Sequence, residues 1–273
     1  MKIGNDAIAE LRKKGFVIVE KFLAEEERGN VLRGFHRYHP PYDAWRKEVE
    51  AGARDPGQPP SYPDFPWKER SLNCLALHPD ILDAAERITG TREIWISTAQ
   101  LGMKYAGQKY WDAFHRDFGN NTLGPRPEPS DGIGVVSFLF FLEDIREGYA
   151  PILMVPYGRP DSEAVPAMVP GGSMVIYTIG VVHSASPFTA PAGDRPAVWS
   201  VISRKDRLWE GRRTTWNGDS LAMQQFIQEA TPRQLEMIGF PPPGDPVWTE
   251  RFLAGMAARY PKFDVARYRR ARS

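Results

Sequence analysis

Short runs of β-branched and aromatic residues dominate the middle of the chain, and Gly and Pro residues separate them. The runs cover residues 94–104, 109–118, 133–142, 152–156, 173–178 and 197–203. Several short strands divided by turn residues are typical of an all-β barrel or sandwich. We therefore expect a mainly β fold whose core covers about residues 92–204.

Helical patterns flank this core on both sides. Helices are expected over residues 5–11, 22–38, 79–88, 219–228 and 247–258, and from Thr231-Pro232 onward. Asn5 or Asp6 is the expected cap of the first helix. A length of 273 residues suits one domain with its own core, so we expect a single domain over residues 1–273.

Charge and cysteine content argue against several classes of protein. The chain has 35 Lys and Arg against 34 Asp and Glu, whereas a nucleic-acid-binding protein usually has a basic excess. The single cysteine, Cys74, cannot form an internal disulfide. The N-terminus has neither a signal-peptide core nor a long apolar span. We therefore expect a cytoplasmic protein without a membrane or nucleic-acid partner.

A His-x-Asp pair lies at the end of one expected strand, in the sequence YWDAFHRDF. Residues two apart on a strand face the same side, so His115 and Asp117 present an imidazole and a carboxylate together. These are two of the three ligands of the facial triad, which binds Fe(II) and leaves coordination positions open. A hydrogen-bonded histidine is the plainer interpretation of such a pair alone, because short motifs match often by chance.

A third ligand has to come from His36, His39, His78 or His183. The first three lie in or beside expected helices. His183 follows the strand expected over residues 173–178, where a side chain can face the mouth of a barrel. We therefore expect His183 to complete the metal site.

Arg195 precedes another expected core strand, twelve residues after His183. A dicarboxylate co-substrate needs a fixed cation, and the planar guanidinium of arginine can bind both oxygens of a carboxylate. Taken alone, Arg195 is most simply a surface residue at a turn. Together with the histidines it favours a co-substrate site.

Five segments, in this order, resemble the phytanoyl-CoA dioxygenase family of Fe(II)/2-oxoglutarate-dependent oxygenases. They are GFVIVEKFLAEEE, FHRDF, VVSFLFFLEDIREGYAPILMVPYGRP, VPGGSMVIYTIGVVHSAS and DRPAVWSVIS. The resemblance covers most of the chain. It implies a double-stranded β-helix (jelly-roll, cupin-like) core, with Fe(II), 2-oxoglutarate and O2 as cofactors. It also implies that His115, Asp117 and His183 are the catalytic iron ligands.

The co-substrate residues follow from the same resemblance. Arg195 would bind the distal carboxylate of 2-oxoglutarate, and Gln100 matches a position that contacts the co-substrate in relatives. The family often has a serine two residues after the distal histidine. Ala185 stands there in this chain, so Ser184, or Ser186, is the expected substitute. Tyr157 also departs from the family pattern, which commonly has glycine at that position.

Aromatic residues surround the metal motif in the sequence. Trp111, Phe114 and Tyr105 are candidates for contact with the substrate, although packing in the core is the simpler account of each. Strand alternation points Arg116 away from the metal ligands. The long loop over residues 51–67, rich in Pro, Gly and aromatic residues, is a candidate lid.

The resemblance implies oxidation of a C–H bond in a small organic molecule, which we take to be a natural-product intermediate, with release of succinate and CO2. Related halogenases have a small residue in place of the carboxylate ligand, so Asp117 favours hydroxylation, or another oxidation by the same intermediate, over halogenation. Two alternatives stay open. One is a metal-dependent, cupin-like isomerase or epimerase without redox chemistry, and the other is a non-catalytic binding protein on the same fold.

Overall fold

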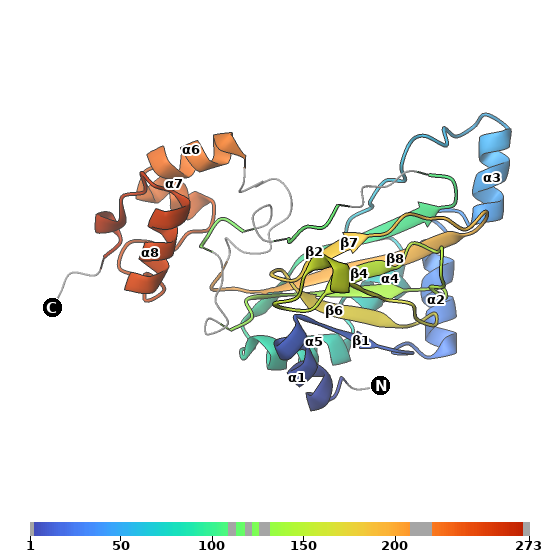
Figure 1. Ribbon diagram of the computed structural model, residues 1–273, viewed down its shortest axis with the longest axis horizontal. Coiled ribbons are helices and arrows are strands. Elements are labelled where there is room, and N and C mark those ends of the chain that lie inside the picture. The colour runs from blue at the N-terminus through green and yellow to red at the C-terminus, as the bar shows by residue number, and fades with distance from the viewer. Residues whose placement is uncertain (1–2, 109–112, 118–121, 126–131, 208–219, 270–273) are drawn as a thin grey trace.

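The structure is a computed structural model that describes residues 3–108, 113–117, 122–125, 132–207 and 220–269. Its strands form two antiparallel sheets (Figure 1). The larger sheet has the order β1 (Phe16–Val19), β6 (Met174–Thr178), β3 (Val135–Phe141), β8 (Asp194–Arg204), β2 (Ile94–Tyr105). The smaller sheet has the order β5 (Val165–Pro166), β4 (Ile152–Val155), β7 (Val182–Ala185). The predicted mainly β fold is confirmed, although β1 joins the larger sheet from outside residues 92–204. In the strand expected over residues 109–118, the described residues 113–117 contain only an isolated bridge at His115.

Helices occur on both sides of this core in the sequence, as predicted. The N-terminal set is α1 (Asn5–Lys14), α2 (Glu25–Phe35), α3 (Tyr42–Glu50), α4 (Arg70–Ala76) and α5 (Pro79–Thr89). The C-terminal set is α6 (Leu221–Glu229), α7 (Pro232–Met237) and α8 (Glu250–Arg259). Two 3-10 turns, η2 (Asp161–Glu163) and η3 (Val265–Arg267), complete the described elements. The sequence did not predict α3 or α4.

Helix ends differ in detail from the predictions. The expected cap of α1 is wrong, because Gly4 is the N-cap and no side chain bonds to the first turn. Thr231 caps α7 as predicted, in a reciprocal capping box with Gln234. Ser220 caps α6. These differences move the ends of the predicted helices by a few residues.

The larger sheet has two different faces because side chains alternate along its strands. On β2, Leu101, Met103 and Tyr105 are buried in one hydrophobic cluster with residues of α1, α2, α4 and α5. The opposite face packs against the smaller sheet in a second cluster, which includes Tyr177 and Ala197. The β-sandwich therefore has helices on one outer face and an interior between its sheets.

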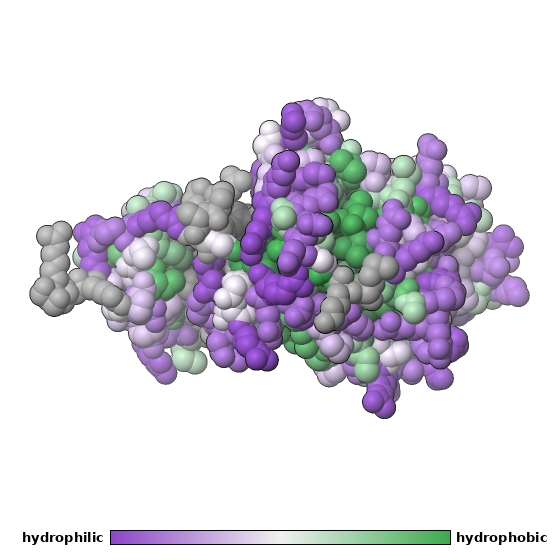
Figure 2. All heavy atoms as spheres, turned by 90° about the horizontal axis from the view of Figure 1, so that it is seen from below, coloured by the Kyte–Doolittle hydropathy of each residue, from purple (hydrophilic) through white to green (hydrophobic). Residues whose placement is uncertain are grey.

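The C-terminal helices gather at one end of the molecule, away from α1–α5 (Figure 1). In the view of Figure 2 most of the surface is hydrophilic, with smaller hydrophobic patches. Within the described residues, no helix has the length and apolar composition needed to cross a membrane.

His39 gives the fold a pH-dependent stability. Its side chain is buried, and in the described part of the chain its Nε2 atom has no hydrogen-bond partner. Burial, aided by Arg54 and His36, lowers the pKa of His39 to about 4 from 6.5. The unfolded chain therefore holds more protons between these two values, and acid favours unfolding there.

We expect the free energy of unfolding to fall by about 3 kcal/mol from this group as the pH falls from about 6.5 to about 4. Urea titrations over this range should show a smaller loss for His39→Leu than for the parent protein. A parent-like slope in His39→Leu would show that other groups cause the loss.

Candidate metal centre

Two chain segments bring the predicted histidine ligands together. His115 and His183 form an antiparallel bridge, in which the N–H of each donates to the carbonyl of the other at 2.9 Å. Directly opposite residues of this kind point their side chains to the same face. The two imidazole rings accordingly lie with their centroids 4.3 Å apart.

Asp117 joins this pair because it lies two residues after His115. Its Oδ1 atom is 3.9 Å from Nε2 of His183. One ligand atom from each of the three residues lies within 4.8 Å of the others, and no second group of this kind occurs among the described residues. The three residues that the sequence suggested as metal ligands therefore form one cluster.

The hydrogen bonds of both histidines favour metal binding through the same ring nitrogen. Nδ1 of His115 is 3.0 Å from the carbonyl of Ala113, and Nδ1 of His183 is 3.2 Å from that of Val181. A carbonyl can only accept, so each Nδ1 carries the proton and the lone pair of the neutral ring is on Nε2. Such partners fix the tautomer and orientation of ligating histidines.

The electrostatics of the cluster also suit a cation. Burial lowers the pKa of His183, and His115 adds to this effect while Asp117 opposes it. The neutral imidazole that results is the form that binds metals. Oδ2 of Asp117 is buried and, within the described residues, has no hydrogen-bond partner. A buried carboxylate oxygen without a partner is costly, and a divalent cation would satisfy it.

The cluster lies in the wall of a cavity of about 300 Å³ between the two sheets. Its lining residues are Tyr62, Gln100, Gly102, Lys104, His115, Asp117, Leu139, Ile152, Tyr177, His183, Ala185, Arg195, Ala197 and Trp199. Neighbouring strands β2 and β8 supply alternate residues to it. The cavity therefore occupies the inner face of the larger sheet.

Arg195 and Lys104 make one end of this cavity cationic. They are direct partners across β8 and β2, and both are buried. Arg195 donates to the carbonyl of Ala150 at 2.9 Å and lies 5.5 Å from the ring centroid of Phe141. Lys104 donates to the carbonyl of Ser186 at 3.2 Å. Sequence reasoning missed Lys104, although its spacing of four from Gln100 places both on one strand face.

Among the other predicted co-substrate residues, Gln100 lies in the cavity wall and Ser184 does not. The side-chain amide of Gln100 donates to Asp64 at 3.0 Å. Ser184 is fully buried and its hydroxyl donates to the carbonyl of Ala185. Strand alternation points His183 and Ala185 into the cavity, so the intervening side chain points the other way.

The predicted substrate contacts are placed differently. Tyr105 is fully buried on the helix-covered face, stacked on Trp45, and its hydroxyl donates to the carbonyl of Pro40 at 2.6 Å. Tyr105 and Lys104 are neighbours on β2, so their side chains point to opposite faces of the sheet. Tyr105 therefore belongs to the core. Phe114 is 37% exposed and does not line the cavity. Trp111 lies outside the described residues.

Part of the predicted lid is a fixed wall of the cavity. Leu101 donates to the carbonyl of Pro63 at 3.0 Å, and Phe65 donates to that of Ala99 at 2.9 Å. These bonds attach residues 63–65 along the edge of β2. They hold Tyr62 beside Gly102, where an added Cβ would lie 3.6 Å from the tyrosine ring. Motion of residues 51–61 stays a prediction.

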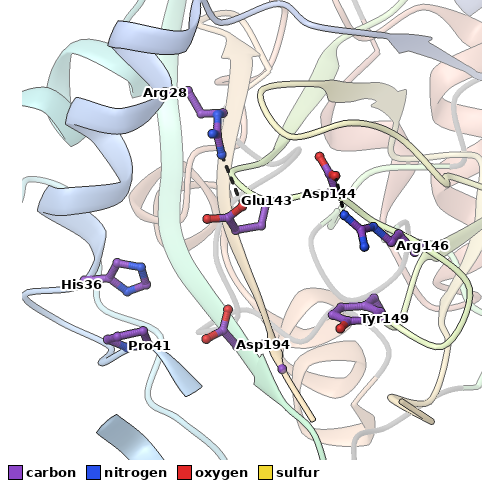
Figure 3. Close-up of a pocket in the computed structure, with 9 residues that line it drawn as sticks. Arg28, His36, Pro41, Glu143, Asp144, Arg146, Tyr149 and Asp194 are labelled. Carbon is purple, nitrogen blue, oxygen red and sulfur yellow. Dashed lines mark hydrogen bonds and ion pairs between the residues drawn. The ribbon is translucent and has the colours of Figure 1, made fainter. Parts of the chain in front are cut away.

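A second cavity, of about 440 Å³, lies elsewhere between α2, the start of β8 and residues 143–149. Figure 3 shows its charged side chains paired with one another: Arg28 with Glu143 at 3.3 Å, and Arg146 with Asp144 at 3.0 Å. Asp194 points into the same space, and burial raises its pKa. This cavity contains none of the predicted metal ligands.

No protein-family model matches the chain, and no curated protein matches it. Solved structures do. EctD from S. alaskensis in its apoform has a TM-score of 0.60 and 14% identity, covering 78% of this chain and 85% of that one. The non-heme alpha-ketoglutarate-dependent carbocyclase SnoK from nogalamycin biosynthesis has a TM-score of 0.56 and 17% identity, covering 77% and 87%.

The epimerase SnoN in complex with Fe3+, alpha-ketoglutarate and nogalamycin RO has a TM-score of 0.55 and 17% identity, covering 77% of this chain and 86% of that one. The chain has the fold of these enzymes. At such low identity the likeness concerns the fold alone, and the site has to be argued from its own residues.

His183→Ala should weaken Fe(II) binding at least about hundredfold, since loss of an outer-shell partner alone typically costs 10–100-fold. Anaerobic calorimetric titration with Fe(II) measures this change. His36→Ala, which removes a histidine of the second cavity, is the matched control and should bind as the parent does. Equal affinities in His183→Ala and the parent would place the metal elsewhere.

Proposed function

We propose that this protein is an Fe(II)/2-oxoglutarate-dependent dioxygenase that oxidises, and specifically hydroxylates, a C–H bond of a small organic molecule. The supporting observation is one cavity whose wall contains both a cluster of metal-ligand side chains and a pair of cations. His115, Asp117 and His183 converge in its wall, and the cationic pair Lys104 and Arg195 lies at one end of it.

The proposal includes the finer description of the fold. We take the two sheets to be a double-stranded β-helix, or jelly-roll, in which the segment carrying His115 pairs with β7 and extends the smaller sheet. We also retain a single domain over residues 1–273 and membership of the phytanoyl-CoA dioxygenase family as proposals. The single domain rests on the length of the chain, and the family membership rests on the order of the motifs in the sequence.

His115, Asp117 and His183 would hold Fe(II) through two Nε2 atoms and a carboxylate oxygen. Three protein ligands leave positions open for a co-substrate, which is the use of the facial triad. With 2-oxoglutarate and O2, the iron supplies the chemistry that breaks the C–H bond and releases succinate and CO2. The protein supplies the fixed ligand geometry and a cavity between two sheets that limits access of water.

Lys104 and Arg195 would bind the distal carboxylate of 2-oxoglutarate. Two buried cations side by side suit an anionic ligand, and the hydrogen bonds of Arg195 and Lys104 to backbone carbonyls help to hold their side chains in place. The next pair along the same two strands is Gly102 and Ala197. These small residues leave room for the carbon chain between the cations and the metal ligands. Gln100 follows on the same face and contacts the co-substrate in this proposal.

The substrate would then bind against the aromatic wall formed by Tyr62 and Trp199. Both line the cavity, and Tyr62 is 53% exposed. An exposed aromatic ring held in place by the neighbouring backbone offers a rigid apolar surface to a small molecule. Trp111 stays a predicted contact, and a natural-product intermediate is the proposed class of substrate.

A non-redox, metal-dependent isomerase is the main competing function. It would use the same His and Asp ligands but has no use for two buried cations beside the metal. The carbocyclase SnoK and the epimerase SnoN show that alpha-ketoglutarate-dependent enzymes of this fold also perform other reactions. The identity of the oxidised product therefore decides between hydroxylation and these outcomes.

The first test is an anaerobic visible spectrum of the apo protein after addition of Fe(II) and then 2-oxoglutarate. Bidentate binding of 2-oxoglutarate to Fe(II) produces a weak metal-to-ligand charge-transfer band. Its appearance in the parent, and its loss in His115→Ala, would support the proposal. Metal binding without any band at saturating 2-oxoglutarate would favour the non-redox isomerase.

Arg195→Ala should raise the 2-oxoglutarate concentration at half-maximal band intensity by about tenfold to hundredfold, since a hydrogen bond to a charged group contributes about 1.5–3 kcal/mol. Arg195→Lys should recover part of the affinity, because lysine keeps the charge without the planar fork. Arg146→Ala, in the second cavity, is the control. An unchanged midpoint in Arg195→Ala would assign the carboxylate to another group.

Tyr62→Ala should leave the charge-transfer band unchanged, because in this proposal Tyr62 contacts the substrate and neither the metal nor 2-oxoglutarate. With a substrate identified by succinate release, the same variant should raise KM about tenfold with little change in kcat, as expected for loss of uniform binding. Tyr62→Phe, which keeps the ring, should behave as the parent. A large loss of kcat at unchanged KM would contradict a binding role.

A further inference from the structure

The C-terminal helices form a lobe with its own hydrophobic cluster. The buried members that follow residue 220 are Ile227, Leu235, Phe240, Trp248, Leu253, Met256, Tyr260, Phe263 and Tyr268. In the described chain, no strand of either sheet shares an extensive contact with α6, α7 or α8. Figure 1 shows the lobe at one end of the molecule. A different segment has to attach the lobe to the metal-binding part.

Residues 122–125 are such a segment. Leu123 is fully buried and belongs to the hydrophobic cluster of the lobe, although it lies about a hundred residues earlier in the chain. Pro125 lies against α8 so closely that a Cβ added at Gly255 would be 2.5 Å from its Cβ. Real Cβ contacts are never this short, so glycine is needed at that position. The lobe therefore closes tightly around this segment.

Three consecutive carbonyl groups of the same segment accept hydrogen bonds from the end of α8. Arg259 Nη1 donates to the carbonyl of Thr122 at 2.6 Å and also to that of Gly124. The hydroxyl of Tyr260, itself fully buried, donates to the carbonyl of Leu123 at 2.7 Å. A guanidinium is rigid, planar and always charged, so it fixes both carbonyls that it bridges. The attachment is thus made to the backbone, at every residue from 122 to 124.

This attachment lies close to the metal ligands in the sequence. Thr122 follows Asp117 by five residues, which limits the separation of their Cα atoms to about 18 Å. On the other side of Asp117, the chain is held by the bridge between His115 and His183 and by Arg116, whose Nε donates to the carbonyl of Gly180 at 3.1 Å. A metal site needs its ligands within about 0.5 Å of the productive geometry, so contacts that hold the chain on both sides of Asp117 favour a well-placed carboxylate.

We propose that Arg259 and Tyr260 are positioning residues for the metal centre. They hold the chain on the C-terminal side of Asp117, as the pairing with His183 holds it on the N-terminal side. The C-terminal lobe thereby acts on metal affinity without contributing a ligand. The inference rests on the Fe(II) site of the proposed function, although it does not depend on the reaction performed there.

The test compares Arg259→Ala, Arg259→Lys and Tyr260→Phe with the parent. Arg233→Ala is the matched control, because it removes an exposed arginine of the same lobe that pairs with Glu236. Fe(II) affinity is measured by anaerobic calorimetry. Hydrogen exchange of the His115 and His183 amides reports on their pairing, and circular dichroism reports on the native fold. The charge-transfer band with 2-oxoglutarate is recorded separately.

We expect about tenfold weaker Fe(II) binding in Arg259→Ala, the lower end of the usual outer-shell effect, with partial recovery in Arg259→Lys. Amide exchange at His115 and His183 should be faster, and Arg233→Ala should match the parent. Tyr260→Phe should show a smaller loss of Fe(II) affinity. If Arg259→Ala fails to fold, the Fe(II) affinity of Tyr260→Phe tests the inference instead. Parent-like Fe(II) affinity in a folded Arg259→Ala would overturn the inference. Absence of the band in the parent would instead overturn the proposed function, while the Fe(II) affinities would still test the positioning.

Discussion

The arrangement of the site depends on one backbone pair, the antiparallel bridge between His115 and His183. Its two hydrogen bonds of 2.9 Å bring together residues that are far apart in the sequence and turn both imidazoles to the same side. Asp117 lies two residues later, in a bend that follows the bridge, and its carboxylate reaches the same space. The three ligands come from two segments, so the correct pairing register between these two segments is enough to bring all three together. A shift of one residue would turn both ligands of the His-x-Asp pair away from the cavity.

The same alternation divides the larger sheet between stability and chemistry. Leu101, Met103 and Tyr105 of β2 pack against helices, whereas Gln100, Gly102 and Lys104 face the cavity. The helices provide the hydrophobic stabilisation of one face, so the other face can tolerate polar and charged residues. Lys104 and Arg195 are buried side by side on that face, where their charges suit an anionic ligand such as the proposed dicarboxylate.

The C-terminal lobe shows how a separate hydrophobic cluster can serve that site. Leu123 is inserted into the lobe, and α8 binds the neighbouring carbonyls through Arg259 and Tyr260. The packing that stabilises the lobe therefore also holds the segment that follows the His-x-Asp pair. This links packing at one end of the molecule to ligand geometry between the sheets.

Local sequence patterns alone determined much of this protein. Short β-rich runs with Gly and Pro between them predicted the β core, and capping at Thr231 predicted the start of α7. The spacing of His115 and Asp117 predicted that they share a face, because strand geometry is local. The sequence also singled out His183 and Arg195, which line one cavity with them.

Only the tertiary structure decided which strands are neighbours, and that pairing controls the rest. The role of Lys104 follows from its position opposite Arg195, and the burial of Tyr105 follows from the helices that cover its face. Likewise, no local pattern links Arg259 to Thr122, which are 137 residues apart. Contacts of this kind depend on the closing of long loops and on packing of the whole chain, and neither is written in a short stretch of sequence.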